Sequence, residues 1–239
     1  MKKLFILTGA SGNLGREIYK LKKPVDTWIL ICNKKKINAD NDDFVINCDF
    51  TLDSDIQKLC NKLYKIMESM QFNEIIFIHA AGKYCKTEWD NMFTDSIWIE
   101  QIKISVLSLI KIINVILKFE NKFEKGNFIG ISTNLVEHSN YGTVPYVSTK
   151  GYLEFIIKLL AKELGKKKIV CNCIEPGLFL SDVSVYDNNK INKIIENTPL
   201  KRLTYATDIV DIIEFLLSDK SNWITGNVII ADGGNRIGY

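Results

Sequence analysis

The sequence predicts a doubly wound α/β fold, in which seven mostly parallel strands form one open sheet with helices on both faces. Three observations lead to this prediction. Seven short apolar runs recur along the 239 residues, helical patterns lie between many of them, and within most runs polar residues do not alternate with apolar ones. An uninterrupted apolar run is typical of a strand that is buried on both faces, as in a parallel sheet covered by helices. Alternation of strands with helices indicates βαβ units.

The strand candidates are rich in Ile, Val, Leu and Phe. They cover residues 4–7, 28–32, 44–46, 75–78, 127–131, 169–174 and 228–231. The helical patterns cover residues 14–21, 54–70, 97–119, 146–164, 191–196 and 208–217. Because we find no linker, repeat or low-complexity stretch, we expect one domain that spans residues 1–239.

The composition narrows the class of protein. Hydrophobic residues make up 46% and charged residues 25% of the chain, as expected for a soluble globular protein with a substantial core. A net charge of +3 does not suggest nucleic-acid binding. No apolar segment is long enough to span a bilayer, and the N-terminal apolar run is too short for a signal peptide. The six cysteines form no C-x-x-C pair and there are only two histidines, so we expect no metal site and a reducing, cytoplasmic location.

A glycine-rich turn follows the first predicted strand and leads directly into a helical pattern. It reads Thr8-Gly9-Ala10-Ser11-Gly12-Asn13-Leu14-Gly15. Glycines let the backbone approach a pyrophosphate closely, and a helix N-terminus favours its negative charge. A purely structural βα turn is the alternative, but this position between a strand and a helix is the context that a Rossmann-type nucleotide site requires. We therefore expect the cofactor pyrophosphate at Gly9, Ser11, Gly12, Asn13, Leu14 and Gly15.

The end of the second predicted strand indicates which nicotinamide cofactor is preferred. An acidic residue at this place binds the ribose 2′-hydroxyl of NAD, whereas basic residues accept the 2′-phosphate of NADP. Here the strand is followed by Asn33 and by Lys34, Lys35 and Lys36, with no acid. We therefore favour NADP; NAD stays open, because a short lysine run is also typical of a solvated turn.

Further short motifs follow the later strands in a fixed order. They are Asp49 with Phe50, His79-Ala80-Ala81-Gly82, Ser132-Thr133, Tyr146-x-x-x-Lys150, Pro176-Gly177 and Asp232-Gly233-Gly234. Together with the glycine turn, this order resembles the short-chain dehydrogenase/reductase family, in its compact single-domain branch. The resemblance covers nearly the whole chain and implies an NAD(P)-dependent oxidoreductase acting on a small-molecule carbonyl or secondary alcohol.

The chain departs from the family pattern at three places. Its glycines fall at positions two, five and eight of the turn, a spacing more typical of the extended branch. The family's Asn-Asn-Ala-Gly is His79-Ala80-Ala81-Gly82 here. The family's relay asparagine in the long fourth helix is matched by Lys103, which puts an asparagine-based proton relay in doubt.

The pair Tyr146 and Lys150 carries the proposed chemistry. Four residues on a helix place both side chains on one face. A free tyrosine has a pKa of about 10 and is a poor base at neutral pH. A neighbouring ammonium group favours the tyrosinate, so Tyr146 can give or take a proton. The resemblance implies that Lys150 also binds the nicotinamide ribose.

The resemblance assigns roles to the remaining motif residues. The family's catalytic hydroxyl lies thirteen residues before the tyrosine, which gives Thr133, with Ser132 as the alternative. Asp49, with Phe50, would bind the adenine, although an acid near a helix start is the alternative reading. Contacts with the cofactor ribose, nicotinamide and carboxamide would come from Ala80, Ala81, Gly82, Pro176, Gly177 and Ser181. Residues 178–199 would form a substrate lid.

Two alternatives to a carbonyl reductase stay open. One is a nucleotide-binding family member with weak or no activity and a sensing or scaffold role. The other is a sugar-nucleotide-modifying enzyme, which only the glycine spacing suggests. In either case, the two long helical patterns carry more apolar residues than one sheet can cover, so we expect a homodimer or homotetramer that pairs through them.

Overall fold

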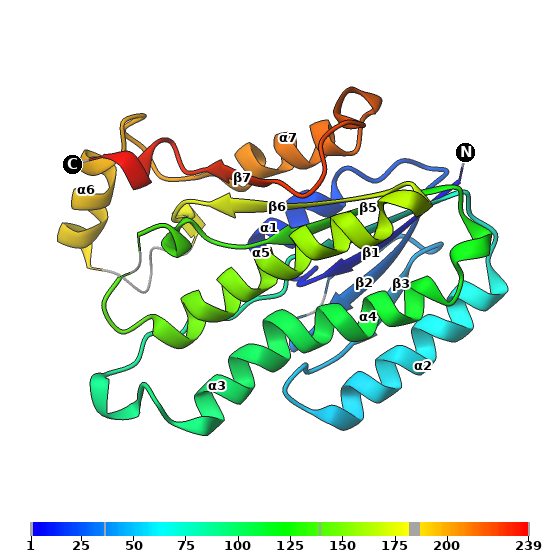
Figure 1. Cartoon of the computed structure of the whole chain (residues 1–239), viewed down its shortest axis with the longest axis horizontal. Helices are drawn as coiled ribbons and strands as arrows, with labels where there is room; N and C mark the ends of the chain where they lie inside the picture. The colour runs from blue at the N-terminus through cyan, green and yellow to red at the C-terminus, as the bar shows by residue number, and fades with distance from the viewer. Residues whose placement is uncertain (1, 36, 139, 182–186, 239) are drawn as a thin grey trace.

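The computed structural model describes residues 2–35, 37–138, 140–181 and 187–238, and within them seven strands form one sheet (Figure 1). The strands are β1 (Lys3–Thr8), β2 (Thr27–Cys32), β3 (Phe44–Asn47), β4 (Glu74–His79), β5 (Lys125–Ile131), β6 (Ile169–Pro176) and β7 (Val228–Ala231). Their order is β3-β2-β1-β4-β5-β6-β7, and every neighbouring pair is parallel. The predicted seven-stranded sheet is therefore confirmed, and it is parallel throughout.

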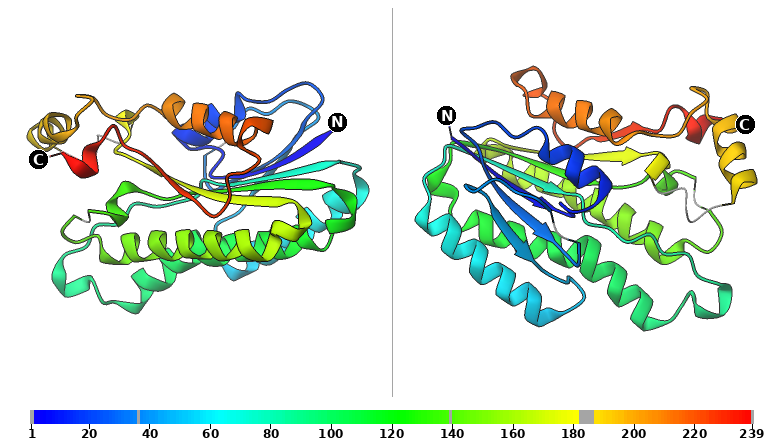
Figure 2. Two further views of the ribbon diagram at one scale, coloured as in Figure 1. Left: turned by 45° about the horizontal axis from the view of Figure 1, so that its top comes forward. Right: turned by 180° about the vertical axis from the view of Figure 1, so that it is seen from behind.

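The helices cover both faces of the sheet. They are α1 (Asn13–Tyr19), α2 (Asp53–Ser69), α3 (Asp95–Ile102), α4 (Ser108–Leu117), α5 (Val144–Leu164), α6 (Asn188–Asn197) and α7 (Ala206–Leu216). Helices α2, α4 and α5 lie on one face, and α1 and α7 lie on the other (Figure 2). Helix α6 stands apart, beyond the carboxyl end of β6 (Figure 1).

Alternate residues of each central strand enter two separate cores. In β1, Leu4 and Ile6 pack into the core beneath α2, α4 and α5, whereas Phe5 and Leu7 pack into the core beneath α1 and α7. All four side chains are buried. Each large apolar side chain that is fully buried contributes roughly 1.5–3 kcal/mol. Burial on both faces is the physical reason why the strands appear in the sequence as uninterrupted apolar runs.

The predicted helix over residues 97–119 is present but contains a π turn. Helix α3 runs without a break into a π-helical turn, Lys103–Leu107, which continues as α4. The hydroxyl of Ser108, the first residue of α4, donates a hydrogen bond to the carbonyl oxygen of Ile104 in the π turn at 2.6 Å. A π turn inserts one residue into the helix and is frequent at functional sites. Apolar spacing predicts the length of such a helix but not the extra residue.

The strand order reverses between β1 and β4. Strand β1 pairs with β2 on one side and with β4 on the other, so the chain moves outward in opposite directions from this point. In open parallel sheets, ligands bind in the crevice at the carboxyl ends of the strands where the order reverses. The sequence motifs predicted to bind a cofactor follow these strand ends.

Over the residues that the structure describes, no helix is both long enough and apolar enough to cross a bilayer.

Candidate active site

The glycine turn packs too closely against its surroundings for larger residues. Gly9 has a positive φ of +68°, and a Cβ atom there would lie 2.7 Å from the carbonyl oxygen of Ala80. A Cβ atom on Gly15 would lie 2.2 Å from the carbonyl oxygen of Gly9. The amide of Gly12 donates to that same oxygen at 3.0 Å, which closes the turn. The spacing of two, five and eight is therefore built into a tight turn that leaves the backbone open to a ligand.

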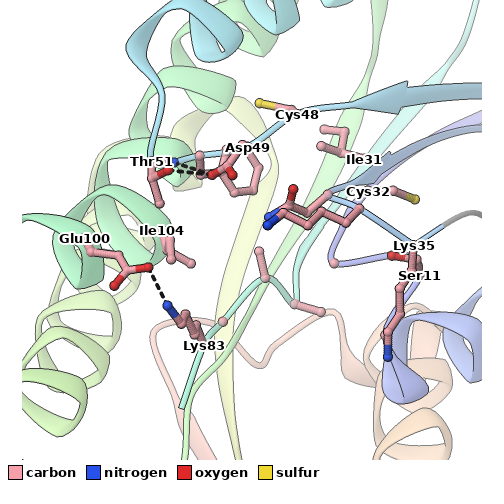
Figure 3. A pocket seen from close by; sticks show the side chains of 18 residues that line it. Ser11, Ile31, Cys32, Lys35, Cys48, Asp49, Thr51, Lys83, Glu100 and Ile104 are labelled. Carbon is pink, nitrogen blue, oxygen red and sulfur yellow. Dashed lines mark hydrogen bonds and ion pairs between the residues drawn. The ribbon is translucent and has the colours of Figure 1, made fainter. Parts of the chain in front are cut away.

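A cavity of about 500 Å³ opens beside this turn (Figure 3). Its walls come from the carboxyl ends of β1, β2, β3 and β4 and from α3. The residues that line it are Gly9, Ser11, Gly12, Ile31, Cys32, Asn33, Lys34, Lys35, Cys48, Asp49, Phe50, Thr51, Ala80, Ala81, Gly82, Lys83, Glu100 and Ile104. Most of the predicted cofactor-binding residues thus meet at one cavity. Asn13, Leu14 and Gly15 lie in α1, just behind the turn.

Basic and polar residues stand at the end of β2, and the acids of the cavity come from elsewhere. Lys34 and Lys35 line the wall with Asn33, whereas Lys36 lies outside the described residues. Asp49 follows β3, and its carboxylate accepts hydrogen bonds from the amide and the hydroxyl of Thr51 at 2.9 and 2.7 Å. These two bonds hold the pKa of Asp49 below its usual range, so it stays ionised. Asp49 makes this turn before α2 and does not cap the helix, whose N-cap is Leu52.

Lys150 joins three segments of the site. Its ammonium group is buried and donates to the carbonyl oxygen of Ile131 at 2.7 Å. A Cβ atom on Gly82 would lie only 3.1 Å from Lys150 Nζ, so the glycine after β4 lets the lysine pass. Burial lowers the pKa of Lys150 to about 8, with weaker opposing effects from Cys173 and Glu154. Tyr146 lies one helical turn earlier on α5, and its ring meets that of Tyr84 edge-on at 5.4 Å.

The two candidate hydroxyls after β5 have different surroundings. The Ser132 hydroxyl donates to the carboxylate of Glu154 in the protein interior. Thr133 Oγ1 accepts a hydrogen bond from the amide of Leu135 at 3.4 Å, which uses a lone pair and not the hydroxyl hydrogen. Ser132 is therefore engaged inside the fold, and Thr133 is the residue with a hydrogen left to donate.

A buried histidine supports the chain after β4. Thr8 Oγ1 accepts from the amide of Ala81 at 3.1 Å and is hydrogen-bonded to Nδ1 of His79 at 2.9 Å. Burial lowers the pKa of His79 to about 3, and the Lys150 ammonium adds to this effect, so the ring is neutral. His79 thus ties the Ala81 segment to β1.

Polar residues at the junction of α3 and the π turn lie on two different sides of the helix. Lys103 points to the rim, where it donates to the carbonyl oxygen of Thr51 at 3.1 Å and pairs with Asp53. Gln101 and Ser105 face the interior instead, and both are fully buried. Among the described residues, neither the Gln101 amide nor the Ser105 hydroxyl has a hydrogen-bond partner. The spacing of Gln101 and Ser105, one turn apart in an apolar helix, is the sequence feature that could have predicted that both face the interior.

The remaining predicted residues lie at the ends of β6 and β7. Pro176 ends β6 beside Ala231, and a Cβ atom on Gly177 would lie 2.8 Å from Thr204 Oγ1. Asp232 accepts hydrogen bonds from Asn134 and from the amides of Gly234 and Arg236, which binds the C-terminal segment to the end of β5. Ser181 is exposed. Of the predicted lid, residues 182–186 lie outside the described residues.

The chain is similar in sequence to known oxidoreductases. A family model described as enoyl-(acyl carrier protein) reductase matches residues 33–236. The chain is 27% identical to the 3-oxoacyl-(acyl-carrier-protein) reductase of Buchnera aphidicola, with 95% of each chain aligned. It is 24% identical to the 7alpha-hydroxysteroid dehydrogenase of Escherichia coli, with 97% of this chain and 93% of the relative aligned.

Solved structures give the same result. The structure of 4-hydroxyisoleucine dehydrogenase complexed with NADH superposes with a TM-score of 0.87 at 25% identity, over 99% of this chain and 100% of that one. A short-chain dehydrogenase from Leptospira borgpetersenii with bound NAD+ has a TM-score of 0.83 at 23% identity, over 99% and 93% of the two chains. The fold, the cavity and the aligned family model together identify the chain as a member of the short-chain dehydrogenase/reductase family of oxidoreductases.

Proposed function

We propose that this protein transfers a hydride between a nicotinamide cofactor and a small molecule that carries a carbonyl or a secondary alcohol. The observation that carries the proposal is the placement of Lys150. Its buried ammonium reaches from α5 to Gly82 at the cavity, one helical turn from Tyr146. A buried lysine beside a tyrosine has few structural advantages, since it costs desolvation energy. It does provide the positive charge that proton transfer by a tyrosine needs.

The residues present fit a dinucleotide. The tight glycine turn presents backbone where a Cβ atom would collide, and the cavity of about 500 Å³ lies beside it. A bound nicotinamide cofactor would supply or accept the hydride. Gly9, Ser11 and Gly12 would hold its pyrophosphate, and Asp49 with Phe50 would contact its adenine. Gly82 and Lys150 would lie at its second ribose.

The protein groups would handle the proton and the substrate oxygen. Tyr146 would act as general acid in reduction and as general base in oxidation. The Lys150 ammonium would stabilise the tyrosinate form electrostatically. Thr133 would donate its hydroxyl hydrogen to the substrate oxygen, since Ser132 is engaged with Glu154.

The decisive test is turnover by a Tyr146→Phe variant. A panel of carbonyl substrates is followed by NADPH absorbance, and the most active compound is then used for the variant. Phenylalanine keeps the ring against Tyr84 but lacks the acid, so kcat should fall by about 10²–10⁴-fold while cofactor affinity persists. Tyr152→Phe, an exposed tyrosine on the same helix, is the matched control. An unchanged rate in Tyr146→Phe would refute the assignment, and tight cofactor binding without turnover of any substrate would favour a sensing role.

We further propose that NADP is preferred over NAD. Lys34 and Lys35 line the cavity at the end of β2, where a 2′-phosphate would lie, and Cys32 and Asn33 precede them. A unit charge about 4 Å from a phosphate contributes about 1 kcal/mol in water, so reversing it in Lys34→Glu should weaken NADPH binding roughly 30-fold. Titration of tryptophan fluorescence measures both affinities. NADH binding should change little, and Lys166→Glu, an exposed lysine in a turn before β6, should change neither. Equal affinity of the unaltered protein for NADPH and NADH would remove this role.

We also propose that one domain holds both binding functions and that it pairs through α4 and α5. Large apolar side chains are exposed on this surface. They are Leu107 at the end of the π turn, Ile110 of α4, and Tyr152, Phe155 and Leu159 of α5. Their exposure, from 38% to 58%, supports a covered surface in a homodimer or homotetramer. The six cysteines are free thiols, which supports a reducing, cytoplasmic location.

A further inference from the structure

Two glutamates meet in the interior beneath the site. Glu154 lies on α5 one helical turn after Lys150, and Glu175 lies near the end of β6, directly before Pro176. Glu175 is 0% exposed and Glu154 is 6% exposed. Burial of two carboxylates is uncommon because each charge loses its hydration. Such a pair needs either cations or protons in its surroundings.

Hydrogen bonds around the pair indicate a proton. The Ser132 hydroxyl donates to Glu154, and the carboxyl groups of Glu154 and Glu175 are close enough to interact directly. Among the described residues, no N–H or O–H group donates to either carboxylate oxygen of Glu175. Ionised carboxylates only accept hydrogen bonds, so two neighbouring buried carboxyl groups can satisfy each other only if one of them carries a hydrogen.

The neighbouring charged groups do not replace that proton. From α5, Lys150 and Lys158 favour ionised Glu154, and from η8 (Asn235–Ile237) Arg236 favours ionised Glu175. Glu137, after η4 (Asn134–Val136), has the opposite effect on both, and the thiol of Cys173 on β6 is also close. Among the described residues, no cation forms an ion pair with Glu154 or Glu175. Burial raises the pKa of both glutamates, and mutual repulsion adds to it for Glu175.

We propose that Glu154 and Glu175 share one proton and together act as positioning residues for the active site. The hydrogen bond made by the shared proton joins α5, which carries Tyr146 and Lys150, to the end of β6. Through Ser132, the same network reaches the end of β5. For its effect on turnover this inference rests on the proposed function, whereas the shared proton is a property of the fold alone.

The network also accounts for the choice between the two hydroxyls after β5. Ser132 has its hydrogen committed to Glu154, so its side chain stays on the inner side of the strand end. The next residue, Thr133, is left as the hydrogen donor outside this network. Loss of the shared proton would leave two negative charges in contact within the interior, and their repulsion would push α5 away from β6.

The pH dependence has a definite sign. In the unfolded chain both glutamates lose their protons near the ordinary glutamate pKa, while the folded pair keeps one of them. The folded state therefore binds more protons, and the stability of the protein without ligand falls as pH rises above the ordinary glutamate range. This loss ends once the folded pair has released its proton.

Glu175→Gln tests the shared proton, because its amide supplies a hydrogen to Glu154 at every pH. Glu163→Gln, an exposed glutamate on α5, is the control. Thermal unfolding is followed from pH 6 to pH 9 without cofactor, and infrared spectra of the unaltered protein are recorded over the same range. The carbonyl band of a buried protonated carboxyl group is expected at pH 7; it should disappear at alkaline pH and be absent from Glu175→Gln.

The stabilities of the two variants should diverge as pH rises. Glu175→Gln should become more stable than the unaltered protein towards pH 9, and Glu163→Gln should follow the unaltered protein. In turnover, Glu175→Gln should match the unaltered protein at pH 7, whereas the unaltered protein should lose about tenfold relative to it for each pH unit above the titration of the pair. Parallel stability curves and no protonated carboxyl band at pH 7 would overturn the proposal. Because both of these measurements need no substrate, they hold even if no carbonyl compound is turned over.

Discussion

Replacement of Lys150 by methionine should make the protein without ligand more stable while abolishing turnover. Lys150 is 3% exposed, and burial lowers the pKa of its ammonium group from 10.5 to about 8. Keeping the charge in the folded protein therefore costs about 3 kcal/mol. Methionine avoids that cost and fills similar volume, but it loses the hydrogen bond to Ile131, worth about 1 kcal/mol. The net expectation is a gain of about 2 kcal/mol at pH 7.

Urea unfolding followed by tryptophan fluorescence measures this difference, and Trp28 is a fully buried reporter. A gain of about 2 kcal/mol corresponds to roughly 4–8 °C in the unfolding temperature. Lys162→Met, an exposed lysine on the same helix, is the control and should change stability little.

The sign of the pH effect provides a second check on Lys150. A lowered lysine pKa means that the folded protein releases its proton before the unfolded chain does, so the cost is full below pH 8 and is relieved from pH 8 towards 10.5. The advantage of Lys150→Met should shrink by about 1.4 kcal/mol per pH unit in that range. If the variant is no more stable than the unaltered protein at pH 7, or if its advantage is the same at pH 7 and pH 9.5, the buried ammonium is not the source of the cost.

Three further predictions concern the turn, the outer helices and the core. Gly9→Ala should cost about 1–2 kcal/mol of stability from the positive φ of Gly9, and it should also weaken cofactor binding because the new Cβ atom would collide with Ala80. Unfolding and equilibrium titration measure the two effects, and an unchanged cofactor affinity would contradict the tight turn. Phe155→Lys should shift the protein to a smaller assembly in analytical ultracentrifugation with the fold intact by circular dichroism, and an unchanged mass would place the contact elsewhere. Ile112→Ala should lower the unfolding free energy by about 2–5 kcal/mol in urea, because Ile112 is fully buried; a loss below 1 kcal/mol would mean that the core beneath α4 collapses to fill the cavity.

The sheet could be predicted from the sequence because a strand that is buried on both faces has an uninterrupted run of apolar residues. Residues 4–7 are apolar without a break since Leu4 and Ile6 face one core and Phe5 and Leu7 the other. The glycine turn was equally legible, since its glycines are needed for steric reasons that do not depend on the rest of the chain. The burial of a strand and the steric limits of a turn each depend on a few consecutive residues, so both can be predicted from a short stretch of sequence.

Contacts between distant segments could not be predicted in this way. Counting from Tyr146 selects Thr133, but only the structure shows that the neighbouring Ser132 is bound to Glu154. Matching the family pattern likewise led to Lys103, and only the structure shows that the side chain of this residue of the π turn lies at the rim. A polar residue in an apolar run signals burial, but its partner is set by how the helices and strands pack.

The parallel arrangement also determines when the site can form. Thr8 meets His79 across 71 positions of the sequence, and Asn134 meets Asp232 across 98. Contacts between such distant positions form slowly, because the intervening chain must first be ordered. A partly synthesised or partly folded chain has the glycine turn but not the strand ends that complete the crevice. The cavity is thus a property of the finished sheet, and a bound cofactor would stabilise the ends of β1, β2, β3 and β4 that line it against local unfolding.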